Sequence, residues 1–99
     1  MDGRKVLEVV ALYQAYFKKR HIPKMDFPHN SSPANYGSQA KDLALAHCHG
    51  MLDKIEVFVT QRRLEKAFRW LGFIQVILWV SGCYTLEELK DCNRPNSAV

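Results

Sequence analysis

Apolar residues recur at three- and four-residue spacing along most of this chain, which is the period of an amphipathic helix. The pattern predicts four helices, over about residues 4–20, 38–59, 62–81 and 86–92. Turn-forming residues predict an irregular loop over residues 21–37. No strand-like alternation of useful length occurs, so the predicted fold class is all-α. A chain of 99 residues encloses one modest core, and we expect a single small helical domain over residues 1–99.

The second and third predicted helices are joined by so few residues that they must form an antiparallel hairpin. Ser38 and Thr60 have the side chains of helix N-caps, and we expect each to cap the helix that follows it. Gly50, inside the second helix, indicates a close backbone approach, because glycine there costs about 1 kcal/mol against alanine. Apolar residues of this helix form a seam for a neighbouring helix, at Ala44, Cys48, Met51, Ile55 and Phe58.

The third predicted helix is too apolar for so small a chain to cover. From Trp70 to Val80 only Gly72 and Gln75 interrupt the large apolar residues. A helix that is apolar all round must be covered on every side. One face should close the hairpin, and we expect the others to meet the first helix or another subunit of an oligomeric bundle. Gly72 would permit close approach there, and Gln75 would need a polar partner.

The short last helix carries its own boundary signals. Gly82 is a typical helix stop, and Thr85 with Glu88 has the T-x-x-E spacing of a capping box. This helix adds to the hairpin at its C-terminal side, as the first helix does at its N-terminal side. The residues after Pro95 are expected to be loose.

Charge is placed unevenly along the chain, whose net charge is +4. Residues 1–24 contain six basic and two acidic residues, which gives +4, and the remaining residues sum to zero. A second basic group surrounds Glu65, at Arg62, Arg63, Lys66 and Arg69. Localised positive charge favours an anionic partner such as nucleic acid, nucleotide or acidic protein. The competing interpretation is a solubilising surface.

Cysteine usage and hydropathy bear on the compartment. The chain has three cysteines, and an odd number without framework spacing favours reduced thiols and an intracellular setting. The start of the chain lacks the pattern of a signal peptide. No apolar run reaches the roughly 20 residues of a spanning helix. We therefore expect a soluble protein without membrane contact.

A cluster of potentially reactive residues lies in the second helix. His47 and His49 point about 200° apart on a helix and cannot chelate one ion together. His49 and Asp53 are one turn apart, but two ligands do not make a zinc site. Cys48 falls on the predicted seam, where a thiol is inert. We expect His47 near the seam, His49 in solvent, and no catalytic residue, metal or cofactor.

Cations and flat side chains are the groups that remain. Arg62, Lys66 and Arg69 begin the third helix, where backbone N–H groups also favour an anion. The loop supplies aromatic and imidazole rings that could contact bases; they are Phe27, His29 and Tyr36. The competing interpretation is a solvated helix face and core aromatics.

The hairpin also carries a resemblance. Its pattern L-E-K-A-x-x-W follows a helix and a tight turn, at Leu64, Glu65, Lys66, Ala67 and Trp70. This resembles the second hairpin helix of phage anti-CBASS cyclic-nucleotide sponges, which share their hairpin with anti-Thoeris sponges. The resemblance covers about residues 39–82. It implies an all-helical homo-oligomer, a hexamer, that sequesters cyclic di- and trinucleotide immune signals between subunits without cleaving them, in the host cytoplasm.

The resemblance assigns roles to the candidate residues. If it holds, the candidate phosphate contacts are Lys41, Arg62, Lys66 and Arg69, and the candidate base-stacking residues are Phe27 and Tyr36, with His29 as a polar contact. The family's short lead-in to the hairpin is replaced here by a longer segment with its own helix, so these residues align only loosely. Two alternatives stay open. The protein could inhibit a host protein by docking its basic first helix, or bind nucleic acid nonspecifically through phosphates.

Overall fold

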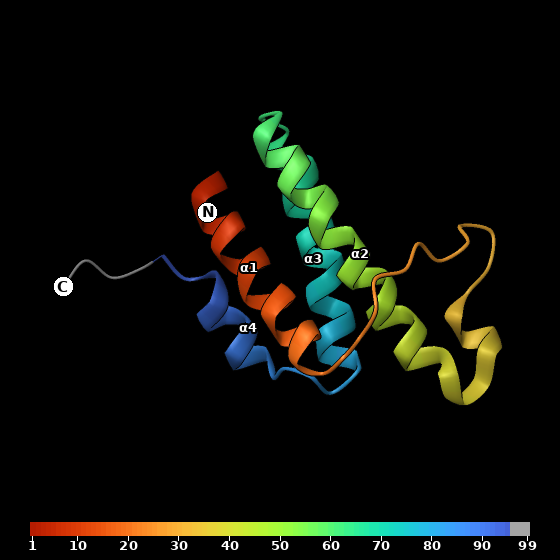
Figure 1. Ribbon diagram of the computed structural model, residues 1–99. Helices are drawn as coiled ribbons and strands as arrows, with labels where there is room; N and C mark the ends of the chain where they lie inside the picture. Colours follow the sequence, from red (N-terminus) through yellow and green to blue (C-terminus); the bar gives the residue numbers. More distant parts are fainter. Residues whose placement is uncertain (96–99) are drawn as a thin grey trace.

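The computed structural model describes residues 1–95 and places them in four α-helices and one short 3₁₀ helix (Figure 1). In chain order the elements are α1 (Gly3–Lys19), η1 (Pro33–Gln39), α2 (Ala40–Thr60), α3 (Leu64–Val80) and α4 (Leu86–Asn93). No strand occurs within residues 1–95, and the predicted all-α class is confirmed. The tail expected to be loose after Pro95 lies outside the described residues.

An antiparallel hairpin of α2 and α3 forms the centre of the fold, and α1 and α4 pack against it (Figure 1). α1 contacts both helices of the hairpin, and α4 contacts α1 and α3. Every α-helix contributes to one hydrophobic core, and its fully buried members include Phe17, Leu52, Ile55, Ile74 and Leu78. Burial of each such side chain stabilises the fold by roughly 1.5–3 kcal/mol. The hairpin with an added helix at each end matches the predicted architecture.

The boundary signals of α4 are confirmed. The hydroxyl of Thr85 accepts a hydrogen bond from the backbone N–H of Glu88, and the Glu88 carboxylate accepts one from the Thr85 N–H. Gly82 has a φ of 77°, a left-handed conformation that favours glycine and ends the preceding helical segment. These signals lie within a few residues of each other, so sequence spacing alone locates them.

The predicted cap at Ser38 is wrong. Ser38 lies inside η1, because the chain turns helical earlier than the spacing indicated. Ser32 caps that turn instead, and its side chain accepts a hydrogen bond from the Ala34 N–H. The stretch over residues 21–37, predicted as an irregular loop, therefore ends in a 3₁₀ helix that leads into α2.

The predicted cap at Thr60 is also wrong. Thr60 is the last residue of α2, and its hydroxyl donates to the carbonyl oxygen of Glu56 at 3.0 Å. A side chain engaged one turn back cannot reach the start of α3. Arg63 occupies the N-cap position of α3 without a side-chain hydrogen bond to the first turn.

The segment after α1 crosses α2 at close range. The backbone N–H of Met25 donates to the Ala46 carbonyl oxygen at 3.0 Å. A methyl group at Gly50 would lie 2.7 Å from the Met25 carbonyl oxygen, which is too close for any real contact. The close backbone approach predicted at Gly50 is confirmed, and it fastens the loop to the helix.

Gln75 has the polar partners that its position in an apolar helix required. Its amide nitrogen donates to the Tyr13 hydroxyl at 3.0 Å and to the Asn93 side-chain oxygen at 2.7 Å. Asn93 donates in return to the Gln75 oxygen at 3.1 Å. Burial raises the pKa of Tyr13, so this hydroxyl stays protonated. The network joins α1, α3 and α4.

Only part of α3 is covered in a single chain. Its buried face closes the hairpin as predicted, through Ala67, Leu71, Ile74 and Leu78. Apolar residues elsewhere on the helix remain exposed, namely Phe73, Val76, Trp79 and Val80, of which Val80 is 72% exposed. Assembly through this surface stays a prediction.

Within residues 1–95, no helix combines the length and apolar character needed to cross a membrane.

Candidate functional site

The turn between α2 and α3 gathers the cations that the sequence singled out. We call this group the basic turn: Arg62, Arg63, Lys66 and Arg69. Together with Leu64 and Glu65 they line a hollow of about 330 Å³. Within residues 1–95 none of the four forms an ion pair, whereas Lys24 is paired with Asp53 at 2.8 Å. The basic turn therefore presents its positive charge to solvent.

Two aromatic rings support the basic turn. The rings of Phe58 and Trp70 meet edge to face with their centroids 4.8 Å apart. The ammonium nitrogen of Lys66 lies 4.6 Å from the Phe58 ring centre, and the guanidinium carbon of Arg63 lies 5.3 Å from it. One ring thus holds two cations near each other, where an anion between them would lower their repulsion. Sequence reasoning had given Phe58 only a place in the hairpin seam.

The start of α3 adds a second source of positive potential. Its N-cap, Arg63, makes no side-chain hydrogen bond to the first turn. The first N–H groups of a helix have no partner inside the helix, and the helix dipole places positive charge there. An anion at the basic turn would meet these groups as well as the side chains.

The loop residues lie at the opposite end of α2. The ring of Phe27 is buried and meets the exposed ring of Tyr36 edge to face, with centroids 5.6 Å apart. His29 is exposed and lies 3.4 Å from the carboxylate of Asp26. Lys41 lies on the exposed side of the first turn of α2. We call this region the loop end of the hairpin.

The structure does not bring the two sets of predicted residues together in one chain. His47 lies at the loop end, and Arg62 follows the other end of α2. The helical rise of about 1.5 Å per residue places the two residues roughly 20 Å apart. The same rise puts Lys41 roughly 30 Å from Arg62. The basic turn and the loop end are therefore separate surfaces, and the assigned ligand contacts stay predictions.

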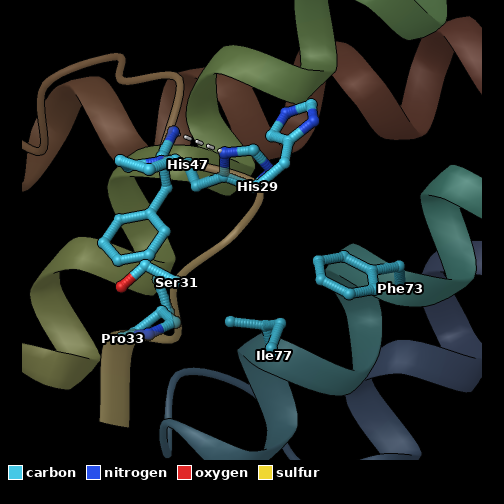
Figure 2. A pocket seen from close by; sticks show the side chains of 9 residues that line it. His29, Ser31, Pro33, His47, Phe73 and Ile77 are labelled. Atoms are coloured by element: carbon cyan, nitrogen blue, oxygen red, sulfur yellow. Dashed lines mark hydrogen bonds between the residues drawn. The ribbon is translucent and has the colours of Figure 1, made fainter. Parts of the chain in front are cut away.

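A mostly apolar pocket of about 230 Å³ opens between the loop and the hairpin (Figure 2). We call it the loop pocket; its walls include Phe27, His29, Pro33, His47, Phe73 and Ile77. Figure 2 shows Phe73 and Ile77 of α3 extending toward the loop, across the opening from His29 and Pro33. Sequence reasoning missed His47 and Phe73 here, because they come from two helices that only the fold places beside the loop.

The expected placement of His49 in solvent is wrong. His49 is 3% exposed, and its Nδ1 lies 2.8 Å from the Ile22 carbonyl oxygen. His47 is half-buried and lines the loop pocket together with Ala44 of the predicted seam, which agrees with its expected place near the seam. The reason for the burial of His49 is the segment after α1, which folds back over α2 and covers His49. The spacing of apolar residues within α2 carries no sign of that cover.

His47 has a defined hydrogen-bond role. The backbone N–H of Phe27 donates to its Nδ1 at 3.0 Å (Figure 2). Nδ1 must then be unprotonated, and the neutral ring carries its hydrogen on Nε2. Burial lowers the pKa of His47 from 6.5; Asp26 raises it, while His29 and Lys54 lower it. The neutral ring that this bond requires is favoured at pH 7.

The remaining chemical candidates on α2 are engaged structurally. Burial raises the pKa of the Cys48 thiol to about 12, which leaves little thiolate at neutral pH, and the predicted seam position is confirmed. His49 faces Ile22, whereas Asp53 faces Lys24 and Gln14. No three His, Cys, Asp or Glu side chains in the described part of the chain gather into a group that could hold a metal.

Comparison with known proteins adds no relative. The chain matches no protein-family model, no curated protein and no solved structure at a significant level.

Proposed function

We propose that this protein is a non-enzymatic binder that sequesters cyclic oligonucleotide second messengers and thereby suppresses host anti-phage signalling. The observation that carries the proposal is the basic turn. Its four cations surround the start of a helix and have no ion-pair partner within residues 1–95. Such a surface suits a phosphodiester better than a neutral ligand.

The arginine and lysine residues of the basic turn would contact a phosphate in different ways. Arginine donates from a planar fork that matches two oxygens of a phosphate, and Arg62 and Arg69 offer this geometry. Lys66 supplies a point charge whose position is set by the Phe58 ring. Sequestration breaks no bond, so it requires binding energy rather than an acid, base or nucleophile. This agrees with the sponge-like pattern in the hairpin.

Assembly of several copies belongs to the same proposal. The loop end and the basic turn lie roughly 20 Å apart along α2, so one ligand could touch both only if they come from different copies. The exposed apolar residues of α3 outside the loop pocket offer a surface for such an assembly, namely Val76, Trp79 and Val80, and exposed patches of this kind mark interaction sites. Under this proposal Phe27, Tyr36, His29 and Lys41 of one copy complete the site of another. The resemblance implies six copies.

Calorimetry with cyclic GMP-AMP and a cyclic trinucleotide tests the proposal. We expect the wild-type protein to release heat on binding and Arg69→Ala to weaken binding at least tenfold, about 1.4 kcal/mol, since charged hydrogen bonds contribute that much or more. Lys19→Ala is the matched control, because Lys19 is also exposed but lies on α1. Absence of heat at tens of micromolar for every ring would refute the proposal.

A salt titration separates the nucleic-acid alternative. A nonspecific binder would hold any duplex, with an affinity that falls steeply as salt rises. Sequestration of one cyclic ligand predicts no competition by duplex DNA. A measured mass in solution tests the assembly, and a monomer at the concentrations used for calorimetry would contradict it.

A further inference from the structure

We infer that the loop pocket is a recognition site for one planar heteroaromatic ring that carries a hydrogen-bond acceptor on its edge, of the kind found in purine bases. The inference rests on the proposed function in one respect only, that the ring would be the base of the sequestered ligand. The site itself stands on the pocket's own residues, which lie roughly 20 Å from the basic turn.

The walls of the pocket favour a flat ring. Phe27 and His29 line it from the loop and Phe73 lines it from α3. Aromatic side chains pair with flat rings through offset-stacked or edge-to-face contacts. Phe73 is 51% exposed, so a ring between it and the loop would cover apolar surface that the single chain leaves in water.

The size of the pocket limits what enters it. Its volume of about 230 Å³ is smaller than the 300–1,000 Å³ typical of pockets for drug-sized ligands. One ring system fits this description better than a whole dinucleotide. The sugar and phosphate of a nucleotide would therefore remain outside, at the mouth of the pocket.

His47 supplies the polar specificity. The Phe27 N–H occupies Nδ1, so the hydrogen of the neutral ring is on Nε2. Within residues 1–95 this Nε2–H has no acceptor. A buried or half-buried donor gains from an acceptor, and a ring edge with a nitrogen or carbonyl oxygen provides one. The pocket thus combines mostly apolar walls with one imidazole N–H donor among its lining residues.

Nuclear magnetic resonance with adenosine tests the site without any phosphate. We expect adenosine to shift the side-chain signals of His47, Phe73 and Ile77, while Trp70 at the basic turn stays unshifted. Indole has a flat ring but no edge acceptor, and we expect it to bind at least threefold more weakly. Absence of shifts at these three residues up to millimolar adenosine, or shifts centred on other residues, would overturn the inference.

Two variants test the aromatic wall at Phe73 and the hydrogen-bond donor at His47 separately. Phe73→Ala should weaken adenosine binding at least tenfold; Phe68→Ala, also exposed on α3 but outside the pocket, should leave it unchanged. His47→Asn keeps an amide oxygen that can accept the Phe27 N–H but removes the Nε2–H. It should erase the preference for adenosine over indole. A preserved preference in His47→Asn would overturn the role of His47.

The outcomes also separate this inference from the proposed function. Arg69→Ala should bind adenosine as the wild type does, because the basic turn does not line the loop pocket. Adenosine binding without any cyclic-nucleotide binding supports the pocket and contradicts the proposed function. Cyclic-nucleotide binding that survives Phe73→Ala and His47→Asn, in a protein that ignores adenosine, contradicts the pocket alone.

Discussion

The two ends of the α2–α3 hairpin are built in opposite ways. The basic turn comes from one contiguous stretch, residues 62–69, and leaves its charges in solvent. The loop end is assembled from three stretches far apart in the chain, around residues 27–33, 44–47 and 73–77. A surface made of neighbours in sequence can be recognised from sequence, whereas a pocket made of distant segments exists only once the chain has folded.

The two ends also differ in what holds them. The loop end depends on hydrogen bonds between distant segments, from Met25 to Ala46, from Phe27 to His47, and between Ile22 and His49. Each such bond contributes on the order of 1 kcal/mol. The basic turn depends on one short turn and the Phe58 ring. Changes that disturb tertiary packing should therefore damage the loop end first.

The largest expected effect tests whether the two ends share one core. Ile74 is fully buried in the core, and Ile74→Ala should lower the free energy of unfolding by about 2–5 kcal/mol. Urea unfolding followed by the nuclear magnetic resonance signals of the Trp70 indole and of the His47 ring should give one common transition. Two separate transitions would show that the ends unfold independently.

The next largest effect should come from a change at the loop end, where the segment after α1 crosses α2. Gly50→Ala places a methyl group against the Met25 carbonyl oxygen, which lies on backbone that cannot move without losing its bond to Ala46. We expect a loss of roughly 1–3 kcal/mol in the free energy of unfolding, the usual range for overpacking.

Gly72→Ala is the control for that change. A methyl group at Gly72 meets nothing within 4 Å, so the single chain gains helix propensity of up to about 1 kcal/mol. Equal effects of Gly50→Ala and Gly72→Ala on stability would contradict the tight crossing at Gly50. If α3 meets another copy at Gly72, this variant should also reduce the measured mass.

A smaller change in the free energy of unfolding should depend on pH, through His47 at the loop end. The folded pKa of His47 lies below the ordinary value of 6.5, so the unfolded chain binds its proton more tightly. The stability is complete above pH 6.5 and falls as the pH drops from 6.5 through the folded pKa. We expect a loss of about 1 kcal/mol, the contribution of the bond from Phe27.

His47→Asn is the control for this pH dependence, because its side chain does not titrate. Urea unfolding of both proteins at several pH values measures the difference between them. A wild-type protein whose stability changes with pH in the same way as that of His47→Asn would show that the Phe27 bond does not depend on the charge of His47.

The sequence located the features that depend on near neighbours. The four helices, the capping box at Thr85 and Glu88, the stop at Gly82 and the cations of the basic turn follow from local spacing. Gln75 belongs here too, because a polar residue in an apolar helix requires a partner wherever that partner lies.

Other features depend on which distant segments cover each other in the folded chain, and local spacing does not show this. His49 was expected in solvent, but the segment after α1 crosses α2 and covers it. The cap prediction at Thr60 failed for a local reason. Its hydroxyl could bond back to Glu56 or forward to α3, and sequence does not rank these options. Phe73 looked like an assembly residue, and only the fold shows that it lines a pocket.

The smallest expected effect on stability belongs to the basic turn. Lys66→Met removes a cation 4.6 Å from the Phe58 ring, a contact that contributes about 0.5–1 kcal/mol at exposed sites. It also removes repulsion from Arg63 and keeps an apolar stem over the same ring, so the net change in the free energy of unfolding should stay within about 0.5 kcal/mol. Cyclic-nucleotide binding should nonetheless fall at least tenfold, because a phosphate would lose a charged partner.

A destabilisation above about 1 kcal/mol in urea unfolding would mean that the Lys66–Phe58 contact supports the fold. Unchanged stability together with unchanged binding would remove Lys66 from the ligand site. The expected pattern is the reverse of Gly50→Ala, which should lower stability and leave the cations of the basic turn in place.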